Sequence, residues 1–162
     1  MISSMFRIPR RALPALATLI AFVSFAADCT NYSVDAQIVN PPLITKIESE
    51  DSGHLLTVAA QNIELGFVGY RMFQGSSEDD ARNEETAESV DCGPIDTPPT
   101  AATDYFIEVK PDKLVVDAED TDHICVFNYS LTPGRYIVLR SLIVQDLVNT
   151  GTSIASNAVI VP

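Results

Sequence analysis

The feature that most constrains the fold of this 162-residue chain is a series of short apolar runs that begins near position 43. The runs are rich in Val, Ile, Leu, Tyr and Phe, and clusters of Gly, Pro, Asp and Asn separate them. Such runs are typical of a many-stranded antiparallel sheet protein, and no long segment with a helical period competes with them. We therefore predict an all-β domain with strands at residues 43–47, 54–60, 69–74, 105–110, 113–117, 123–131, 135–145 and 153–161.

Two local patterns refine this prediction. The segment 135–145 is apolar at both alternate positions, which is expected of a central strand covered on both faces. Pro111 and Asp112 predict a turn, since proline presets a backbone angle that turns require. We expect the strands on either side of this turn to pair there.

The N-terminal region has the features of an export signal. A basic region precedes an apolar run at residues 13–27 that carries no charge. This run of about 15 residues is shorter than the roughly 20 that a membrane-spanning helix needs, so a cleaved leader is favoured. The small residues Ser24 and Ala26 predict cleavage after Ala26; the alternative is an N-terminal helix buried in the core. The basic residues are Arg7, Arg10 and Arg11.

This interpretation divides the chain into a signal peptide at 1–26, a polar tether at 27–40 and a domain at 41–162. Cys29 permits a second interpretation, in which it is the lipidated first residue of a bacterial lipoprotein. Asp28 departs from that pattern, because a small residue is needed before the cysteine. With the lipid, acyl chains anchor the protein to a membrane; without it, the protein is free in the periplasm or outside the cell.

Export would place the cysteines in an oxidising compartment, where disulfides persist. Cys92 and Cys125 are the natural pair, which leaves Cys29 as the lipid site or an odd thiol in the tether. The alternative is that Cys92 and Cys125 are two unpaired buried thiols. No C-x-x-C pair is present, so zinc and redox sites of that type are excluded.

The charge balance limits the classes of partner. The chain has 10 basic and 22 acidic residues, for a formal net charge of −12. A surface of this sign repels nucleic acid and anionic membrane faces. We therefore expect a protein partner, with basic character, and membrane contact only through a lipid anchor.

The acids gather in one segment, residues 75–104, which we interpret as a long solvated loop inserted into the domain. Loops of this length in compact domains are either functional or disordered. As a functional loop it would contact a basic partner; the alternative is a loop that only increases solubility. The candidate contact residues are Glu78, Asp79, Asp80, Glu84, Glu85 and Glu88.

The sequence contains no motif for catalysis. A nucleophile elbow, a P-loop, a dinucleotide glycine pattern and a zinc-protease helix are all absent. We expect His54 and His123, at the starts of strands, to be exposed edge residues. The carboxylates between Asp117 and Asp122 suggest calcium, but Asp122 occupies the position where an EF-hand needs glycine. We expect a charged loop there, no cofactor or metal, and no enzymatic activity.

Three stretches resemble a fibronectin type III module, which is an immunoglobulin-like β-sandwich. Residues 131–136 (Leu-Thr-Pro-Gly-Arg-Tyr) resemble the L-x-P-G-T-x-Y turn of this family. Residues 69–75 are similar to its third strand, and residues 151–157 resemble its final G-x-S-x-x-S stretch. The tryptophan typical of the second strand is missing, and the apolar residues near Leu56 and Val58 take its place.

The tyrosine also departs from the family pattern, because Tyr136 comes one residue early. We expect Ile137, Leu139 and Ile143 to face the core and the family's tyrosine corner to be absent. The resemblance implies an immunoglobulin/fibronectin type III-like β-sandwich with the acidic insertion at one edge. By analogy it implies protein–protein interaction or adhesion, including binding to host proteins.

The leading hypothesis is thus an exported, non-enzymatic binding module at the cell surface or in the medium. One alternative is a structural spacer lipoprotein of the periplasm or envelope. A second alternative is a small carbohydrate-active or carbohydrate-binding domain, although a chain without Trp offers few aromatic rings for stacking on sugars.

Overall fold

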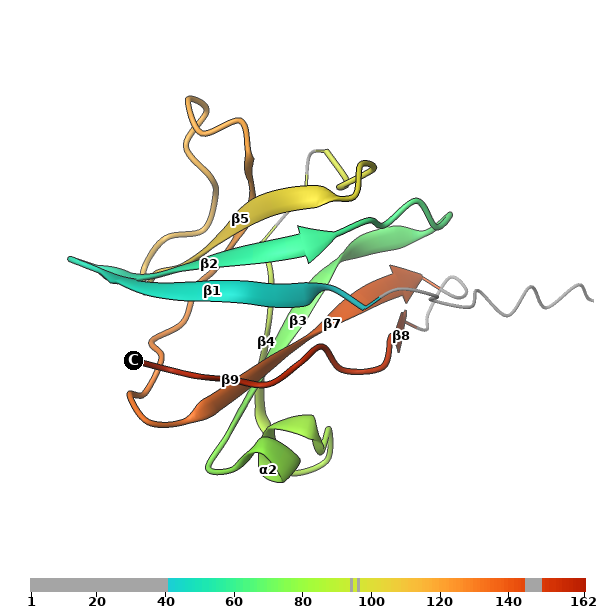
Figure 1. The fold of residues 1–162 in the computed structure, drawn as a ribbon. Helices are drawn as coiled ribbons and strands as arrows, with labels where there is room; N and C mark the ends of the chain where they lie inside the picture. Colours follow the sequence, from blue (N-terminus) through green and yellow to red (C-terminus); the bar gives the residue numbers. More distant parts are fainter. Residues whose placement is uncertain (1–40, 94, 96, 145–149) are drawn as a thin grey trace, which may run out of the picture. The chain divides into compact units, whose positions relative to one another are not determined.

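The computed structural model describes residues 41–93, 95, 97–144 and 150–162. Within these residues the chain forms two β-sheets that pack on each other (Figure 1). The all-β prediction is therefore confirmed. The predicted signal peptide, tether and lipidation site lie outside the described residues. Among the residues described, no helix has the length and apolar character needed to cross a membrane.

The first sheet has four strands in the order β1-β2-β5-β6. Strands β1, β2 and β5 are antiparallel neighbours, whereas β6 runs parallel to β5. The parallel pair requires the chain between β5 and β6 to return along the sheet before β6 begins. The bounds are β1 (Leu43–Glu50), β2 (Gly53–Ala60), β5 (Thr103–Val109) and β6 (His123–Phe127).

The second sheet is antiparallel throughout and has the order β4-β3-β7-β8, with β9 also paired to β7. Strand β7 is therefore central and β4 forms an edge. The bounds are β3 (Phe67–Gly75), β4 (Glu88–Asp91), β7 (Tyr136–Val144), β8 (Thr150–Thr152) and β9 (Val159–Ile160).

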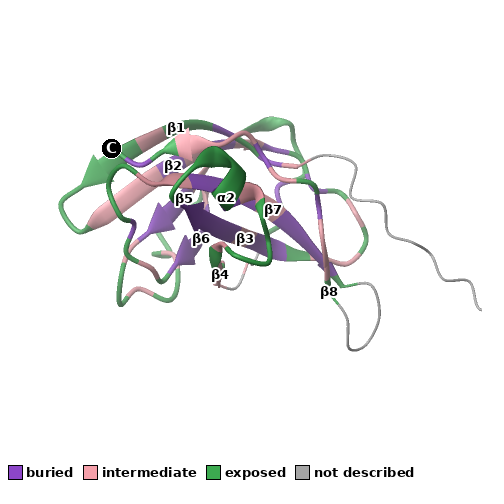
Figure 2. Ribbon diagram, turned by 90° about the horizontal axis from the view of Figure 1, so that it is seen from below, coloured by how far each residue is buried: buried purple, intermediate pink, exposed green. Residues whose placement is uncertain are grey.

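The core lies between the two sheets. Alternate side chains of a strand point to the same face, so each strand contributes every second residue to the core. One cluster of buried apolar residues receives members from both sheets. Figure 2 colours the buried stretches of β3, β5, β6 and β7 purple. Its inner members include Leu56 and Val58 of β2, Ile107 and Val109 of β5, Tyr70 and Met72 of β3, and Ile137 and Leu139 of β7.

Strand β7 is buried on both faces, as its composition predicted. Ile137 and Leu139 belong to the core between the sheets. Val138, on the opposite face, packs with Phe73 and Ala81 in a second, smaller cluster. Ile137, Leu139 and Ile143 are all fully buried, as expected.

The prediction of a loop over residues 75–104 is wrong in its main point. The segment contains the helix α2 (Glu78–Arg82), the strand β4 and the first residues of β5. Ala81 of the helix is completely buried against the outer face of the second sheet. The helix was missed because its five residues are too few to show a helical period; a buried alanine and tertiary contacts stabilise it instead.

Three predicted strands also need correction. Residues 113–117 form no strand, because Lys113 turns toward Glu108 and the backbone crosses to the start of β6. The turn at Pro111 and Asp112 is present, but it does not form a hairpin. It lies at the start of the connection between β5 and β6, residues 110–122, which we call the crossover. The segment 153–161 is regular only at β9, and β6 ends at Phe127 instead of extending to residue 131.

A disulfide and a side-chain bridge help to connect the sheets besides the core. The predicted disulfide between Cys92 and Cys125 is present and joins the residue after β4 to β6, with the two Cα atoms 5.9 Å apart. The Asn157 side chain accepts a hydrogen bond from the Ile44 amide and donates one to the Ile44 carbonyl, both at 2.9 Å. The Asn157 side chain therefore makes the two backbone hydrogen bonds that a neighbouring strand would otherwise make at the start of β1.

Candidate functional site

The acidic residues singled out from the sequence lie around α2 and the start of β4. Ser77 caps the helix, since its hydroxyl accepts a hydrogen bond from the Asp80 amide at 3.1 Å. Acids in the first turn are stabilised by the positive end of the helix. We call the set the acidic corner, and its members are Glu78, Asp79, Asp80, Glu84, Glu85 and Glu88.

Three members of the acidic corner form ion pairs within the molecule. Each of these pairs involves an arginine, and the oxygen–nitrogen distances are 2.9 to 3.0 Å. Asp79 and Glu85 are exposed and form no ion pair with any described residue. The acidic corner thus keeps a net negative charge, from Asp79 and Glu85, that its three internal ion pairs do not neutralise. The three pairs are Glu78–Arg82, Glu84–Arg140 and Glu88–Arg135.

Glu88 is the best anchored of these acids. Tyr129 donates a hydrogen bond to its carboxylate at 2.6 Å, and Arg135 donates another at 3.0 Å. These two contacts, with the tyrosine first, lower the pKa of Glu88. Burial, and then the nearby Glu88 carboxylate, raise the pKa of Tyr129 to about 12, so its hydroxyl stays a donor at neutral pH.

A shallow groove of about 220 Å³ lies beside Glu88. Its walls are the end of β3, the start of α2 and the residues that lead into β4, together with Arg135. Gln74 at its base is buried, and its amide already bonds to the Tyr129 hydroxyl and the Thr132 amide. The groove has the size of one side chain, and within its lining the Ser76 hydroxyl donates a hydrogen bond to the Asp80 carboxylate.

Every lysine and arginine among the described residues is paired with a carboxylate, at 2.5 to 3.0 Å. The reverse does not hold, because acids outnumber bases about two to one in the sequence. In the described part of the chain, several carboxylates therefore have no Lys or Arg partner, whereas every Lys and Arg has a carboxylate partner. Carboxylates with no Lys or Arg partner among the described residues include Asp51, Glu64, Asp79, Asp80, Glu85, Asp104, Asp112, Glu119, Asp120 and Asp122.

A second polar cluster, which sequence reasoning missed, surrounds Glu108 on the outer face of the first sheet. The Glu108 side chain is only 1% exposed. Its carboxylate accepts hydrogen bonds from the Lys113 ammonium at 2.7 and 2.9 Å and contacts Lys110 at 3.0 Å and His123 at 3.0 Å. Burial opposes ionisation, but these three partners outweigh it and lower the pKa of Glu108 to about 2.

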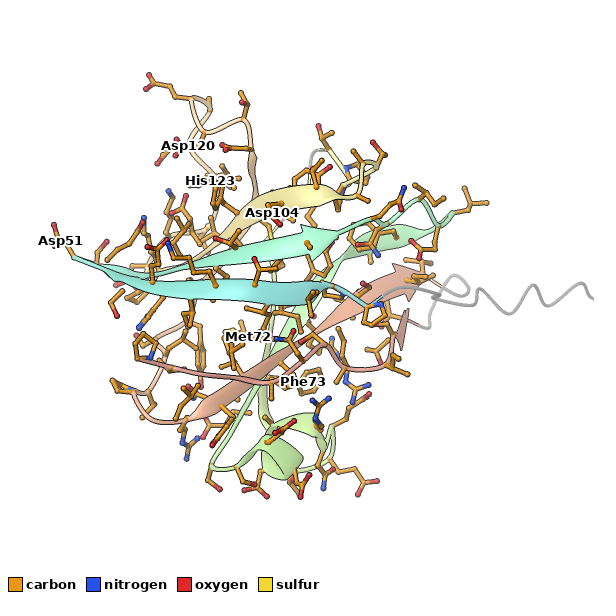
Figure 3. All side chains as sticks on the ribbon, viewed as in Figure 1. Asp51, Met72, Phe73, Asp104, Asp120 and His123 are labelled. Atoms are coloured by element: carbon orange, nitrogen blue, oxygen red, sulfur yellow. A yellow bond between two sulfur atoms is a disulfide. The ribbon has the colours of Figure 1, made fainter. Side chains whose placement is uncertain are left out.

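Glu108, Asp120 and His123 place one ligand atom each within 4.8 Å of one another, which is the spacing of a metal site. Figure 3 labels Asp120 and His123 beside the crossover. A cation does not suit this position, because two ammonium groups already contact Glu108 and would repel it. The cluster is better explained as the anchor that holds the crossover to the sheet. The prediction that His54 and His123 are exposed edge residues is wrong, since both are half-buried. His54 lies on β2, between β1 and β5, and His123 is covered by this contact and by the Phe106 ring.

Comparisons of the chain with models of protein families, with curated proteins and with solved structures find no match. The arrangement of the chain's own residues therefore carries the functional argument. No local pattern distinguished Glu108 from an exposed acid, because the lysines that surround it are brought there by the crossover. The acidic corner, in contrast, was visible as a run of acids, although its helix was not.

Proposed function

We propose that this chain is an exported, non-enzymatic binding module that holds a basic protein partner through its acidic corner. The observation that carries the proposal is the one-sided pairing of charges. All described cations are neutralised within the molecule, whereas Asp79 and Glu85 of the corner are exposed without such a partner. The described residues therefore hold no unpaired Lys or Arg that could bind these two carboxylates.

The rigidity of the corner supports the same proposal. The helix rests on the sheet through Ala81, and the Arg140 guanidinium donates a hydrogen bond to the Arg82 carbonyl at 2.9 Å. Charges held on a fixed backbone give up less side-chain freedom on binding than charges on a free loop. Such a charged surface mainly accelerates association and selects partners of opposite sign.

The fibronectin type III interpretation belongs to this proposal. The two-sheet arrangement is compatible with it, and sandwiches of this type commonly present loops and edges to other proteins. The fold alone does not specify a ligand, so the acidic corner bears the argument. Export also remains part of the proposal, and the intact mass of protein recovered from cells tests it. A mass that begins after Ala26 supports export, and the mass of the uncleaved chain contradicts it.

A binding measurement with matched variants tests the proposed contact. The probe is a lysine-rich peptide, titrated against the full chain at ionic strengths of about 0.02 and 0.15 M, where screening differs strongly. The double variant D79N/E85Q is expected to bind severalfold more weakly at low salt. The control is D51N/D104N, which removes two carboxylates elsewhere on the molecule; both positions are labelled in Figure 3. Equal losses in the two variants would contradict a contact at the acidic corner.

A further inference from the structure

We infer that the basic partner binds as an added β-strand along the free edge of β4. This inference rests on the proposed function and names the form of the partner: an extended peptide segment that carries Lys or Arg. Edge strands offer a row of backbone donors and acceptors to a new strand. The question is which edge of this fold remains open.

The structure closes parts of the other long edges. On the free side of β6, the Gly93 amide donates a hydrogen bond to the Val126 carbonyl at 2.9 Å. At the start of β1, Asn157 occupies both backbone groups of Ile44. No such cover is found over β4 among the described residues.

The hydrogen-bond pattern of β4 shows which groups are free. In an antiparallel pair, successive residues point their backbone groups alternately toward and away from the neighbour. The Cys92 amide donates to the Tyr70 carbonyl at 2.8 Å, so Cys92 points toward β3. By alternation Val90 also points toward β3, and Ser89 and Asp91 point away from it. No described backbone group bonds to the amides or carbonyls of Ser89 and Asp91.

The surroundings of this edge favour a cationic strand. Glu85 precedes β4 by three positions and is exposed, and Glu88 begins the strand. The groove beside Glu88 has room for one side chain and lies at the start of β4, between the end of β3 and α2. A strand laid along β4 would thus pass the unpaired Glu85 carboxylate while its backbone bonds to Ser89 and Asp91. The carboxylates of β4 itself, Glu88 and Asp91, are already paired with Arg135 and Arg71. An acidic or neutral strand would gain the backbone bonds only.

Amide exchange on the full chain, labelled with ¹⁵N, provides the direct test. The probe is the peptide acetyl-Lys-Val-Lys-Val-Lys-amide. On saturation we expect the exchange rates of the Ser89 and Asp91 amides to fall by at least about tenfold, because both become hydrogen-bonded. The Val90 amide is already bonded to β3 and should change little. A peptide of the same charge, with N-methyl groups on the amides that face β4, should bind at least about tenfold more weakly.

A pair of variants at Ser89 tests the same edge from the protein side. S89P removes the outward amide without touching the ladder to β3, a position where an edge strand tolerates proline. S89A keeps that amide and serves as the control. We expect S89A to bind the peptide as the original chain does and S89P to lose at least about tenfold in affinity. If S89P fails to fold, the N-methylated peptide still decides the question.

The outcomes separate this inference from the proposed function. Salt-dependent binding that is equal for both peptides, with no added protection at Ser89 and Asp91, would overturn the added strand and leave the acidic contact standing. Absence of salt-dependent binding by either peptide would overturn both. Protection of Ser89 and Asp91 without peptide, rising with protein concentration, would mean that a second copy occupies the edge, and it would also overturn the inference.

Discussion

Glu108 is a carboxylate that stays ionised where water is almost excluded. Removing a charged group from water costs several kcal/mol unless partners replace the lost hydration. Here two ammonium groups and an imidazole supply that replacement: Lys110 and Lys113 lie in the crossover, and His123 follows it directly. The charge thus fixes a segment that has no strand or helix of its own.

The substitution E108Q should therefore destabilise the protein and change its response to acid. The ordinary pKa of the carboxyl, 4.5, falls to about 2 in the folded protein. A lowered pKa stabilises the fold above pH 4.5, and this contribution is lost as the pH falls toward 2. We expect E108Q to lose about 2 kcal/mol of unfolding free energy at pH 7. This is less than the loss for a fully buried ion pair, because both lysines are partly exposed to water and the solvent weakens their attraction to Glu108. Urea unfolding at several pH values measures both effects.

A suitable control for E108Q is E119Q, which changes an exposed carboxylate of the same crossover that has no ion pair with a described residue. It should leave the unfolding free energy nearly unchanged. The loss of stability between pH 4.5 and 2 should be smaller in E108Q than in the original chain and in E119Q. An equal acid response in all three would contradict the role assigned to Glu108.

At the scale of elements, α2 depends on one close approach to β3. A Cβ atom added to Gly75 would lie 2.6 Å from the Asp80 carbonyl carbon and 2.8 Å from the Ala81 Cα atom. These atoms belong to the helix backbone and cannot move aside without moving the helix. The glycine therefore lets the helix pack against the sheet, and with it sets the position of the acidic corner.

The substitution G75A should displace α2 and destabilise the protein by about 1 to 3 kcal/mol, the usual cost of overpacking. Thermal unfolding measures this loss. Because the helix carries part of the acidic corner, G75A should also weaken binding of the lysine-rich peptide although it changes no charge. A matched control is G134A, where an added Cβ meets no atom within 4 Å, although its positive φ adds strain. Unchanged stability and binding in G75A would contradict the described packing.

The elements differ in how well sequence could predict them. Strands β2, β3 and β7 alternate or continue in apolar residues, so their pattern shows the core face directly. The helix α2 and the crossover escape such reasoning, because tertiary contacts set their positions: Val138 and Arg140 of β7 hold the helix, and Glu108 holds the crossover. In the acidic corner, the acids themselves were predictable, but their pairing with Arg135 and Arg140 was not, since that pairing requires the folded sheet.

At the scale of the whole molecule, the disulfide joins the two sheets at one edge. Cys92 and Cys125 are 33 residues apart in the sequence. Closing a loop of this size restricts the unfolded chain and stabilises the folded one by about 3 to 4 kcal/mol in the chain-entropy view. This is a large share of the 5 to 15 kcal/mol that is typical of domains.

The variant C92S/C125S should therefore unfold at a clearly lower urea concentration, with a loss of about 3 to 4 kcal/mol. The original chain treated with reductant should show a similar loss, whereas the variant should not respond to reductant. A reductant effect of equal size in both proteins would contradict the assignment of the bond.

The bridge from Asn157 to Ile44 has a consequence for the order of events during synthesis. Its two partners lie 113 positions apart, so the first strand emerges from the ribosome long before the residue that satisfies its backbone. Contacts this distant in sequence form late and slowly. The start of β1 therefore lacks these two backbone partners until nearly all of the domain has been synthesised.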